Sequence, residues 1–162
     1  MHYAEGFCTG TYCKKVNDTL KQVVQSYENN VRILYKSLPL PNHPQAFRAA
    51  QAAHCADAQG KFWQYHDLLF EHSSDLSDKA LKGYVAEVNL KSKDFNACLD
   101  SEASRAAVMK DVQEARRAGV FSTPTFIING RMLKGAKNLE DFKVVIDQAL
   151  KERNGWKTSL TQ

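Results

Sequence analysis

The sequence predicts an α/β fold in which a small mixed sheet carries helices on both faces and an all-helical segment interrupts the chain. Two short segments rich in β-branched and apolar residues, 31–38 and 125–133, supply the clearest strands. Between them, residues 45–119 follow a helical pattern throughout. The chain has 162 residues, close to the usual size of one domain, so we expect a single domain over 1–162 with a helical insertion at about 45–119.

Composition and charge exclude several classes of protein. Hydrophobic residues make up 43% of the chain and charged residues 25%, which is typical of a globular domain and not of a disordered or fibrous chain. The net charge of +4 is spread along the chain, so we expect no nucleic-acid partner. No apolar stretch approaches the length of a membrane span, so we expect no membrane insertion by this chain. Its first residues do not resemble a secretion signal either.

The first third of the chain predicts a strand, a helix and a second strand. Residues 1–7 form a weak strand, because Glu5 and Gly6 interrupt the alternation of polar and apolar residues. Residues 14–28 form an amphipathic helix with Cys13 at its first turn. Its apolar stripe is Val16, Leu20, Val23, Val24 and Tyr27. Residues 31–38 form a buried strand that runs into a proline-rich turn.

The remaining elements follow from helical spacing and turn chemistry. Within 45–119 the helices are separated at Gly60, Ser73–Ser74, Asn89 and Gly119, and their apolar content includes Phe62, Trp63, Leu69, Phe70, Leu81, Val85, Val108 and Val112. Asn129-Gly130 between two apolar segments predicts a β-hairpin. A last helix begins at Asn138, a good N-cap with Asp141 three residues later, and we expect it to end near Asn154 because Gly155 follows.

The cysteines Cys8, Cys13, Cys55 and Cys98 are the residues most able to carry chemistry. Four cysteines can pair in three ways, and their spacing does not choose among these. We expect no metal site, because the chain has no Cys-x₂-Cys unit and His66 and His72 are too far apart for a zinc pair. Cys13 stands where the free N–H groups and the dipole of a helix start favour a thiolate.

Several motifs, in this order, resemble the DsbA-like branch of the thioredoxin superfamily. They are Tyr12–Lys15, Pro39–Pro41, His54–Ala56, Gln59–Trp63, Tyr65–Asp67 and Gly119–Gly130. The resemblance covers nearly the whole chain. It implies a thioredoxin fold, a βαβ–ββα mixed sheet with an all-helical insertion. It also implies a thiol–disulfide oxidoreductase acting on cysteines of substrate polypeptides, with no cofactor and with a redox partner that recycles the dithiol.

The sequence departs from this family at the nucleophilic cysteine. The family motif resembles Cys-X-X-Cys-Lys-Lys, so Cys13 matches the second cysteine and Gly10 stands where the first is expected. Three interpretations stay open. Cys8 replaces the missing thiol, or the protein keeps only the fold and the peptide-binding surface, or the first dozen residues carry a gene-model irregularity. Cys13 is the predicted catalytic residue, as resolving or sole redox cysteine, with Cys8 as a conditional partner.

The resemblance also implies a substrate-binding edge and a structural disulfide. Pro124 matches the family's cis-proline, Thr123 would offer its backbone to an extended substrate, and Tyr12 would lie beside the reacting cysteines. Cys55 and Cys98 match two cysteines that similar proteins often carry, which implies a bridge between helices. Such a bridge favours a periplasmic or otherwise exported location, with the cytoplasm as the alternative.

Two other functions fit the same fold. Because Gly10 replaces the nucleophile, the chain is alternatively a redox-inactive peptide-binding or chaperone-like module. A third hypothesis is a glutathione-dependent transferase of the kappa type, a related branch that tolerates a changed active-site motif. Fold alone does not decide among these functions.

Overall fold

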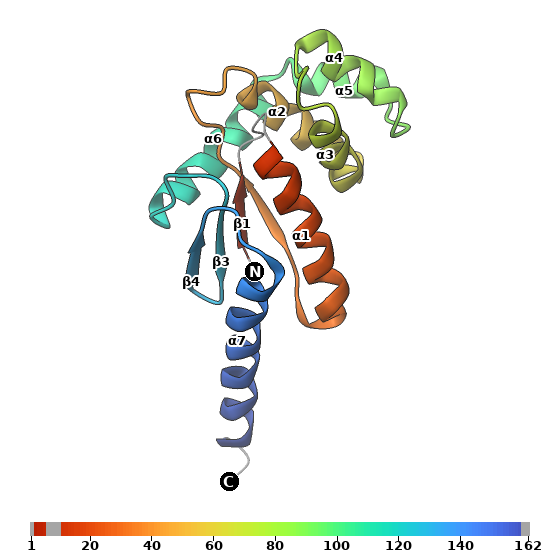
Figure 1. Ribbon diagram of the computed structural model, residues 1–162. Helices are drawn as coiled ribbons and strands as arrows, with labels where there is room; N and C mark the ends of the chain where they lie inside the picture. The colour runs from red at the N-terminus through yellow and green to blue at the C-terminus, as the bar shows by residue number, and fades with distance from the viewer. Residues whose placement is uncertain (1, 6–10, 160–162) are drawn as a thin grey trace.

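A four-stranded mixed sheet lies between helices in the computed structural model, and a group of helices extends from one end of it (Figure 1). The structure describes residues 2–5 and 11–159, and the side chains from 15 to 153 with the exception of 29. The strands are β1 (His2–Glu5), β2 (Leu34–Ser37), β3 (Thr125–Ile128) and β4 (Arg131–Lys134). The helices are α1 (Thr11–Tyr27), α2 (Ala46–Asp57), α3 (Phe62–Glu71), α4 (Asp78–Gly83), α5 (Ser92–Leu99), α6 (Glu102–Arg117) and α7 (Leu139–Ser159), with short 3₁₀ turns at Glu28–Asn30 and Tyr84–Ala86.

The order of the strands is β2-β1-β3-β4, so β1 and β3 are central. β1 runs parallel to β2, with Tyr3 opposite Tyr35, and antiparallel to β3, with Tyr3 opposite Phe126. The weak strand expected near the N-terminus is therefore a central strand of the sheet. β2 is shorter than the expected segment 31–38, because β1 offers partners to only four of its residues.

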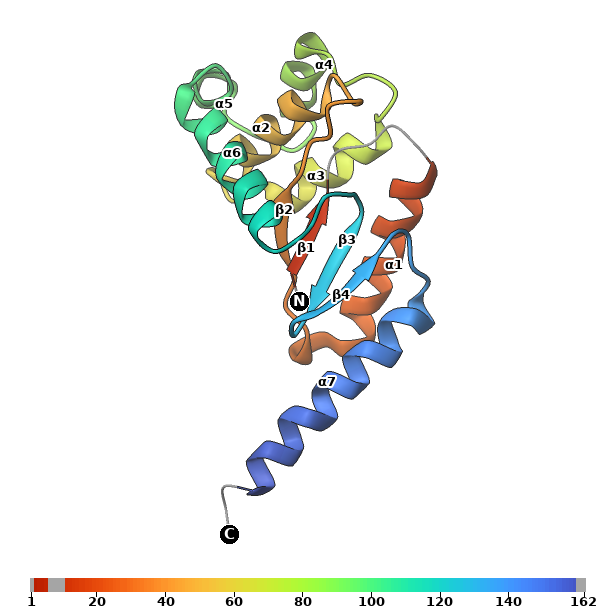
Figure 2. The same cartoon turned by 90° about the vertical axis from the view of Figure 1, so that its left-hand side faces the viewer.

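Two helices cover one face of the sheet and a third covers part of the other (Figure 2). On the first face, α1 and α7 bury Phe126 and Ile128 of β3. On the second face, Ile127 packs against a cluster formed by α6, the residue after β2 and the connection from α6 to β3, which comprises Leu38, Val112, Ala115 and Val120. The alternation along β3 follows from the period of two in a strand. The expected helices on both faces of a mixed sheet are confirmed.

The connection between β2 and β3 is helical, as the sequence predicted. Its helices α2 to α5, together with the start of α6, form their own apolar core around Tyr65, Phe95 and Leu99, all fully buried. Trp63 was expected among the core residues of this segment, but 43% of its surface is exposed. It lies in the first turn of α3, on the side turned toward α1, where the packing leaves a groove.

Local chemistry explains the remaining turns. Asn129 and Gly130 both adopt positive φ between β3 and β4, as a tight hairpin turn requires. At the start of α7, the backbone N–H of Asp141 donates to Asn138 Oδ1 at 2.9 Å, and the N–H of Asn138 donates to the Asp141 carboxylate. The expected end near Asn154 was wrong, since α7 continues through Gly155 to Ser159. Glycine weakens a helix by about 1 kcal/mol relative to alanine, which does not by itself end one.

Within the described residues, none of the helices combines the length and the apolar character needed to cross a bilayer.

Candidate active site

The start of α1 and the start of β3 lie at the same end of the sheet. β1 leads into α1, and near its C-terminal end Ala4 is paired with Thr125, the first residue of the antiparallel strand β3. The residue before Thr125 is Pro124, so the register brings the Thr123–Pro124 corner to the edge from which the chain departs toward α1 (Figure 2). This register places two parts of the predicted site, more than 100 residues apart in sequence, at the same end of the sheet.

Cys13 is the third residue of α1, in the first turn of the helix. The first N–H groups of a helix have no intrahelical partner, and together with the helix dipole they stabilise an anion placed there. The first turn of α1 contains no acidic residue that would oppose this effect. Tyr12 is its neighbour in the same turn, and Cys8 lies outside the described residues. The backbone thus places Cys13 where a thiolate is favoured.

The Thr123–Pro124 corner is fixed by hydrogen bonds on both sides of the proline. The peptide bond between the two residues is cis. The carbonyl of Pro124 accepts a hydrogen bond from the N–H of Gly135 at 2.8 Å, and the hydroxyl of Thr125 donates to the carbonyl of Ser122 at 2.7 Å. Pro124 is buried and Thr123 is half-buried. A corner held in this way presents a constant backbone shape to a ligand.

A polar cluster at Asp67 ties α1 to α3. Asn17, one turn after Cys13, donates to Asp67 Oδ1 at 2.8 Å, and the Lys21 ammonium lies 2.8 Å from Asp67 Oδ2. The ring of His66, which is fully buried, has its Nδ1 3.3 Å from the same carboxylate. The cluster therefore fixes α1, the helix that carries Cys13, against the insertion.

Opposing effects act on the pKa of Asp67. Burial by itself would raise the pKa, but hydrogen bonds from His66, Lys21 and Asn17 hold the pKa of this carboxyl well below its usual range. The hydrogen bond to Asp67 in turn raises the pKa of Lys21. Asp67 is therefore ionised near neutral pH. Sequence reasoning included His66 and Asp67 only as part of a family motif, and the spacing of four between Asn17 and Lys21 was the available signal for a shared partner.

A groove of about 470 Å³ lies between α1 and α3 next to this cluster. Its lining is mainly apolar and consists of Asn17, Leu20, Lys21, Val24, Gln25, Val31, Ile33, Trp63 and Asp67. Val24 was expected in the buried stripe of α1, but it is 42% exposed and lines this groove. The two exposed apolar residues of this region, Val24 and Trp63, thus belong to one surface feature.

Cys55 of α2 and Cys98 of α5 form a disulfide, with their Cα atoms 5.7 Å apart. The pairing that the resemblance implied is present, and it lies inside the helical insertion, with Cys55 buried in its core. The residues around the disulfide join helices of the insertion to one another. Arg48 of α2 donates to the carbonyl of Leu99 and pairs with Asp78 and Asp100, which joins α2, α4 and the end of α5.

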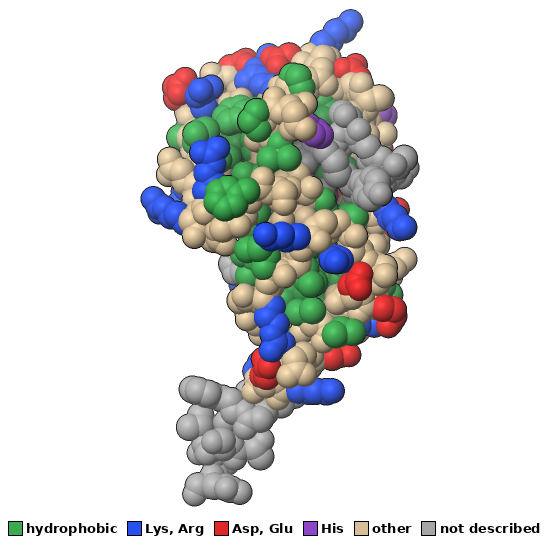
Figure 3. Space-filling model, turned by 60° about the vertical axis from the view of Figure 1, so that its left-hand side comes forward, with side chains coloured by type: hydrophobic (Ala, Val, Ile, Leu, Met, Phe, Trp, Pro, Cys, Tyr) green, Lys and Arg blue, Asp and Glu red, His purple; other side chains and the backbone are tan. Residues whose placement is uncertain are grey.

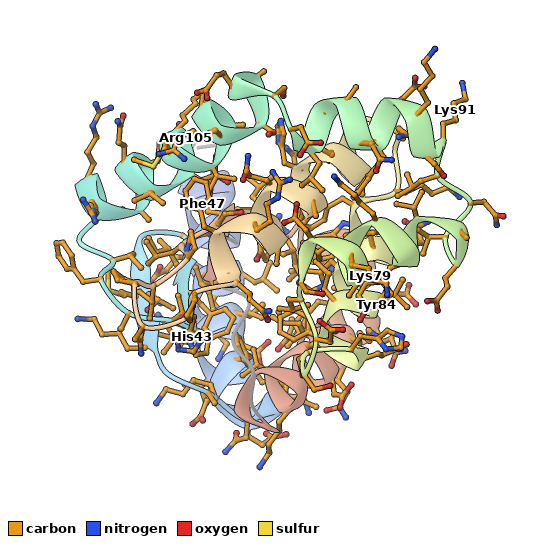
Figure 4. All side chains as sticks on the ribbon, turned by 90° about the horizontal axis from the view of Figure 1, so that it is seen from above. His43, Phe47, Lys79, Tyr84, Lys91 and Arg105 are labelled. Atoms are coloured by element: carbon orange, nitrogen blue, oxygen red, sulfur yellow. A yellow bond between two sulfur atoms is a disulfide. The ribbon has the colours of Figure 1, made fainter. Side chains whose placement is uncertain are left out.

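His66 lies in α3 and His72 directly follows it, whereas His43 lies elsewhere. His43 lies on the connection from β2 to α2, away from the part of the insertion that carries Lys79 and Tyr84 (Figure 4). In the same view Arg105 of α6 approaches the ring of Phe47 of α2, with 5.5 Å from the guanidinium carbon to the ring centre. Within the part of the chain that the structure describes, no group of three or more His, Cys, Asp or Glu residues could hold a metal ion.

Comparison with known proteins identifies a family and a fold. The family model described as thioredoxin matches residues 2–148. A thioredoxin-like oxidoreductase from Silicibacter pomeroyi DSS-3 is similar in structure, with a TM-score of 0.82 and 21% identity over 93% of this chain and 85% of that one. The thiol-disulfide exchange protein α-DsbA2 from Wolbachia pipientis has a TM-score of 0.80 and 18% identity, over 91% of this chain and 80% of its own. A periplasmic thioredoxin-like protein from Salmonella enterica serovar Typhimurium has a TM-score of 0.76 and 22% identity, over 93% of this chain and 83% of that one.

The curated relatives are longer proteins that match this chain over a small part of their length. An Na(+)/H(+) antiporter NhaA 1 from Salinispora arenicola is 33% identical over 139 residues, which is 85% of this chain and 21% of the antiporter. An Na(+)/H(+) antiporter NhaA from Herminiimonas arsenicoxydans is 31% identical over 158 residues, which is 98% of this chain and 24% of the antiporter. The chain thus spans about a fifth to a quarter of these relatives, and ion transport is not carried over to it.

Proposed function

The chain belongs to the thioredoxin family and has the fold of its DsbA-like members, and on that premise we propose that it exchanges thiols and disulfides with cysteines of substrate polypeptides. The observation that carries the proposal is the placement of Cys13 in the first turn of α1, at the end of the sheet that also holds the Thr123–Pro124 corner. A cysteine carries an abundant thiolate near neutral pH when it lies at a helix N-terminus or beside a cation. The N-terminus of α1 supplies the first of these conditions for Cys13.

The exchange reaction proceeds in two steps. A thiolate attacks one sulfur of a disulfide, so that one S–S bond forms while another breaks and the departing sulfur takes up a proton. A second thiol then resolves the mixed disulfide in the same way. Overall, one dithiol loses two electrons and two protons, and the disulfide that it reduces gains them. Cys13 supplies one of the protein's sulfurs and Cys8 is the candidate for the other. The thiol or disulfide of a redox partner then returns the protein's cysteines to their starting redox state.

The substrate binds along the Thr123–Pro124 corner. An extended polypeptide beside this corner can form main-chain hydrogen bonds with Thr123, in the manner of an added strand. Hydrogen bonds hold both sides of Pro124 in place, so this corner loses little conformational entropy when the substrate binds. Tyr12, the residue before Cys13, is the third member of the proposed binding edge.

An exported location agrees with the Cys55–Cys98 disulfide, because such bonds persist in oxidising compartments. One of the similar solved structures is that of a periplasmic thioredoxin-like protein. We therefore assign this chain to the periplasm or another exported compartment.

One observation favours a second candidate function. Gly10 stands where the family carries its nucleophilic cysteine. Without a partner thiol the mixed disulfide is not resolved, and the protein would act as a peptide-binding or chaperone-like module on the same fold.

A disulfide-reduction assay with insulin separates the two functions. Wild type, Cys13→Ser and Cys8→Ser are compared, and a Cys55→Ser/Cys98→Ser double variant serves as the control that removes the other pair. We expect Cys13→Ser to lose activity and the control to keep it when it is folded. If wild type and both single variants show only the same background activity, the exchange function is excluded and the peptide-binding module is the remaining interpretation. Glutathione conjugation by wild type would instead indicate the kappa-type transferase.

A count of free thiols by mass spectrometry, before and after reduction, accompanies this assay. Two bridges in the oxidised protein would support a Cys8–Cys13 dithiol as the redox centre.

A further inference from the structure

The two edges of the sheet are protected to different degrees. β4 forms one edge, and its Arg131 and Lys134 side chains are exposed. Lys and Arg side chains are spread over the side of the molecule on which β4 lies (Figure 3). Charged residues, lysine above all, keep an edge strand from pairing with another chain. Among the described strands β2 forms the other edge, with α6 beside it, and a cavity follows this edge (Figure 2).

The cavity beside β2 has a volume of about 430 Å³ and is lined on one side by residues 33–37. The opposite side is formed by residues from α2, α3 and α6 and from the connection between α2 and α3, namely His54, Asp57, Gly60, Phe62, Trp63, Gln64 and Asp111. Ile33 and Trp63 also line the groove between α1 and α3, so the two spaces adjoin each other. We call these two adjoining spaces the edge groove.

The backbone of β2 directs hydrogen-bonding groups toward the edge groove. In a parallel pair, alternate residues of a strand direct their N–H and C=O groups to the neighbouring strand, and the residues between them direct theirs away. The N–H of Ser37 donates to Asp111 Oδ2 of α6 at 3.0 Å, so Ser37 belongs to the set that faces away from β1. Ile33, four positions earlier, belongs to the same set. The Asp111 carboxylate therefore takes the place of a strand at one end of this edge, and Ile33 lies at the other end.

The side chains on the two faces of β2 determine what an added strand would contact. Ile33 lies on the face covered by α1, where Trp63 of α3 and Val24 of α1 are large apolar residues that stay exposed. Exposed apolar residues that gather in one place mark an interaction surface. On the opposite face, Lys36 binds the carboxylate of Asp111. Because side chains alternate along a strand, every second residue of an added strand would face the apolar surface.

The edge groove also contains acidic groups, although the chain carries a net charge of +4. The Lys36 ammonium lies 3.0 Å from Asp111 and 2.8 Å from Glu114, so one cation serves two carboxylates. Asp57, at the end of α2, is exposed, and within the described residues no ion pair involves it. A segment with Lys or Arg side chains is therefore attracted to this groove.

We propose that the edge groove binds an extended segment of a partner protein, which adds to the sheet as a further strand beside β2. The segment has apolar residues at alternate positions, which contact the surface at Trp63, and Lys or Arg residues between them, which meet the carboxylates. Main-chain hydrogen bonds with Ile33 supply affinity, and the side-chain contacts select the sequence. β1 separates β2 from β3, so this surface is distinct from the Thr123–Pro124 corner and its occupation does not require thiol exchange.

Binding is measured with three short fluorescent peptides that contain no cysteine. The first alternates valine and lysine, the second alternates valine and glutamate, and the third is the first peptide with alternate amides N-methylated. We expect the valine–lysine peptide to bind and the other two to bind about tenfold more weakly. The glutamate peptide lacks the complementary charge, and the N-methylated peptide cannot donate the hydrogen bonds of a strand.

Two sets of variants locate the contact. Trp63→Ser should weaken binding of the valine–lysine peptide about tenfold, while Trp63→Phe keeps most of it. Val144→Ser is the matched control, because Val144 on α7 is 70% exposed and lies outside the groove. Asp57→Lys should weaken binding about fivefold. Asp94→Lys on α5 makes the same change of charge at an exposed residue outside the groove and should leave binding unchanged.

Amide resonances in NMR spectra show where the peptide lies. We expect shifts and slower hydrogen exchange at Ile33, in wild type and in Cys13→Ser alike. Shifts centred on Thr123 would place the peptide at the substrate corner and overturn the inference. Equal binding of the N-methylated peptide, or no effect of Trp63→Ser and Asp57→Lys, would also overturn it. Self-association of wild type that both variants abolish, measured by sedimentation velocity, would assign the groove to a second copy of the chain instead.

Discussion

The helical insertion and the sheet core are stabilised in different ways. The insertion has a continuous apolar core, a disulfide between α2 and α5, and an arginine that joins three of its helices. The sheet has four strands of four residues each, and the apolar residues of α1, β3 and α7 hold its main face together. The proposed site lies at the end of the sheet, next to the insertion. The difference indicates that the proposed site lies on the region with fewer cross-links and is supported by the region with more of them.

The largest effects test whether the two regions unfold together. Phe95 in the insertion and Phe126 in the sheet are both fully buried phenylalanines. Replacing either by alanine removes a large apolar side chain and leaves a cavity, which costs about 3–5 kcal/mol. Urea unfolding, followed by circular dichroism and by tryptophan fluorescence, measures the loss. We expect coincident transitions for both variants. Separate transitions in either one would show that the regions unfold independently.

The next effect concerns the disulfide of the insertion. Replacing Cys55 and Cys98 by alanine opens a loop between residues 43 apart, which costs about 3–4 kcal/mol in the chain-entropy model. Thermal unfolding of the double variant against wild type measures it. A loss of stability with unchanged exchange activity would confirm a purely structural bridge. A loss of activity in the folded variant at low temperature would mean that the insertion must be cross-linked for the site to work.

A smaller effect concerns the polar cluster between the two regions. Asp67→Asn removes charge-assisted hydrogen bonds to Lys21 and His66 and should cost about 2 kcal/mol at neutral pH. Folding lowers the pKa of Asp67, so its contribution is present above the unfolded value, about 3.9, and is lost as the pH falls below it. The stability difference between wild type and Asp67→Asn should therefore shrink from pH 5 downward. A difference that stays constant over this range would refute the assignment.

The smallest effects compare one helix cap in each region. Ser101 accepts a hydrogen bond from the N–H of Ser104 at the start of α6, and Asn138 accepts one from the N–H of Asp141 at the start of α7. Replacing either cap by alanine should cost about 1 kcal/mol. Chemical unfolding of Ser101→Ala and Asn138→Ala gives the two values. Nearly equal values are expected, because the bonds are alike whichever region the helix belongs to.

Much of the fold follows from local sequence signals. The helical segment 45–119, the hairpin at Asn129-Gly130 and the start of the last helix were predicted from spacing and turn chemistry, and the structure confirms them. The extent of β2 and the end of α7 were not predicted well. Pairing with β1 limits β2, and a single glycine is too weak a signal to end a helix. The single-domain boundaries and the roles of Cys8, Cys13, Tyr12, Thr123 and Pro124 stay predictions.

The amino-acid order by itself determined which segments are helices and strands and that a cysteine heads the first helix, because these depend on residues a few positions apart. Only the tertiary structure decided that Asp67 joins α1 to α3, that Trp63 borders a groove, and that Phe121 stands exposed beside the Thr123–Pro124 corner. The physical reason is that burial and hydrogen-bond partners depend on contacts between elements distant in sequence. The spacing of apolar residues indicates which face of an element is buried. It does not indicate which neighbouring element leaves part of that face exposed.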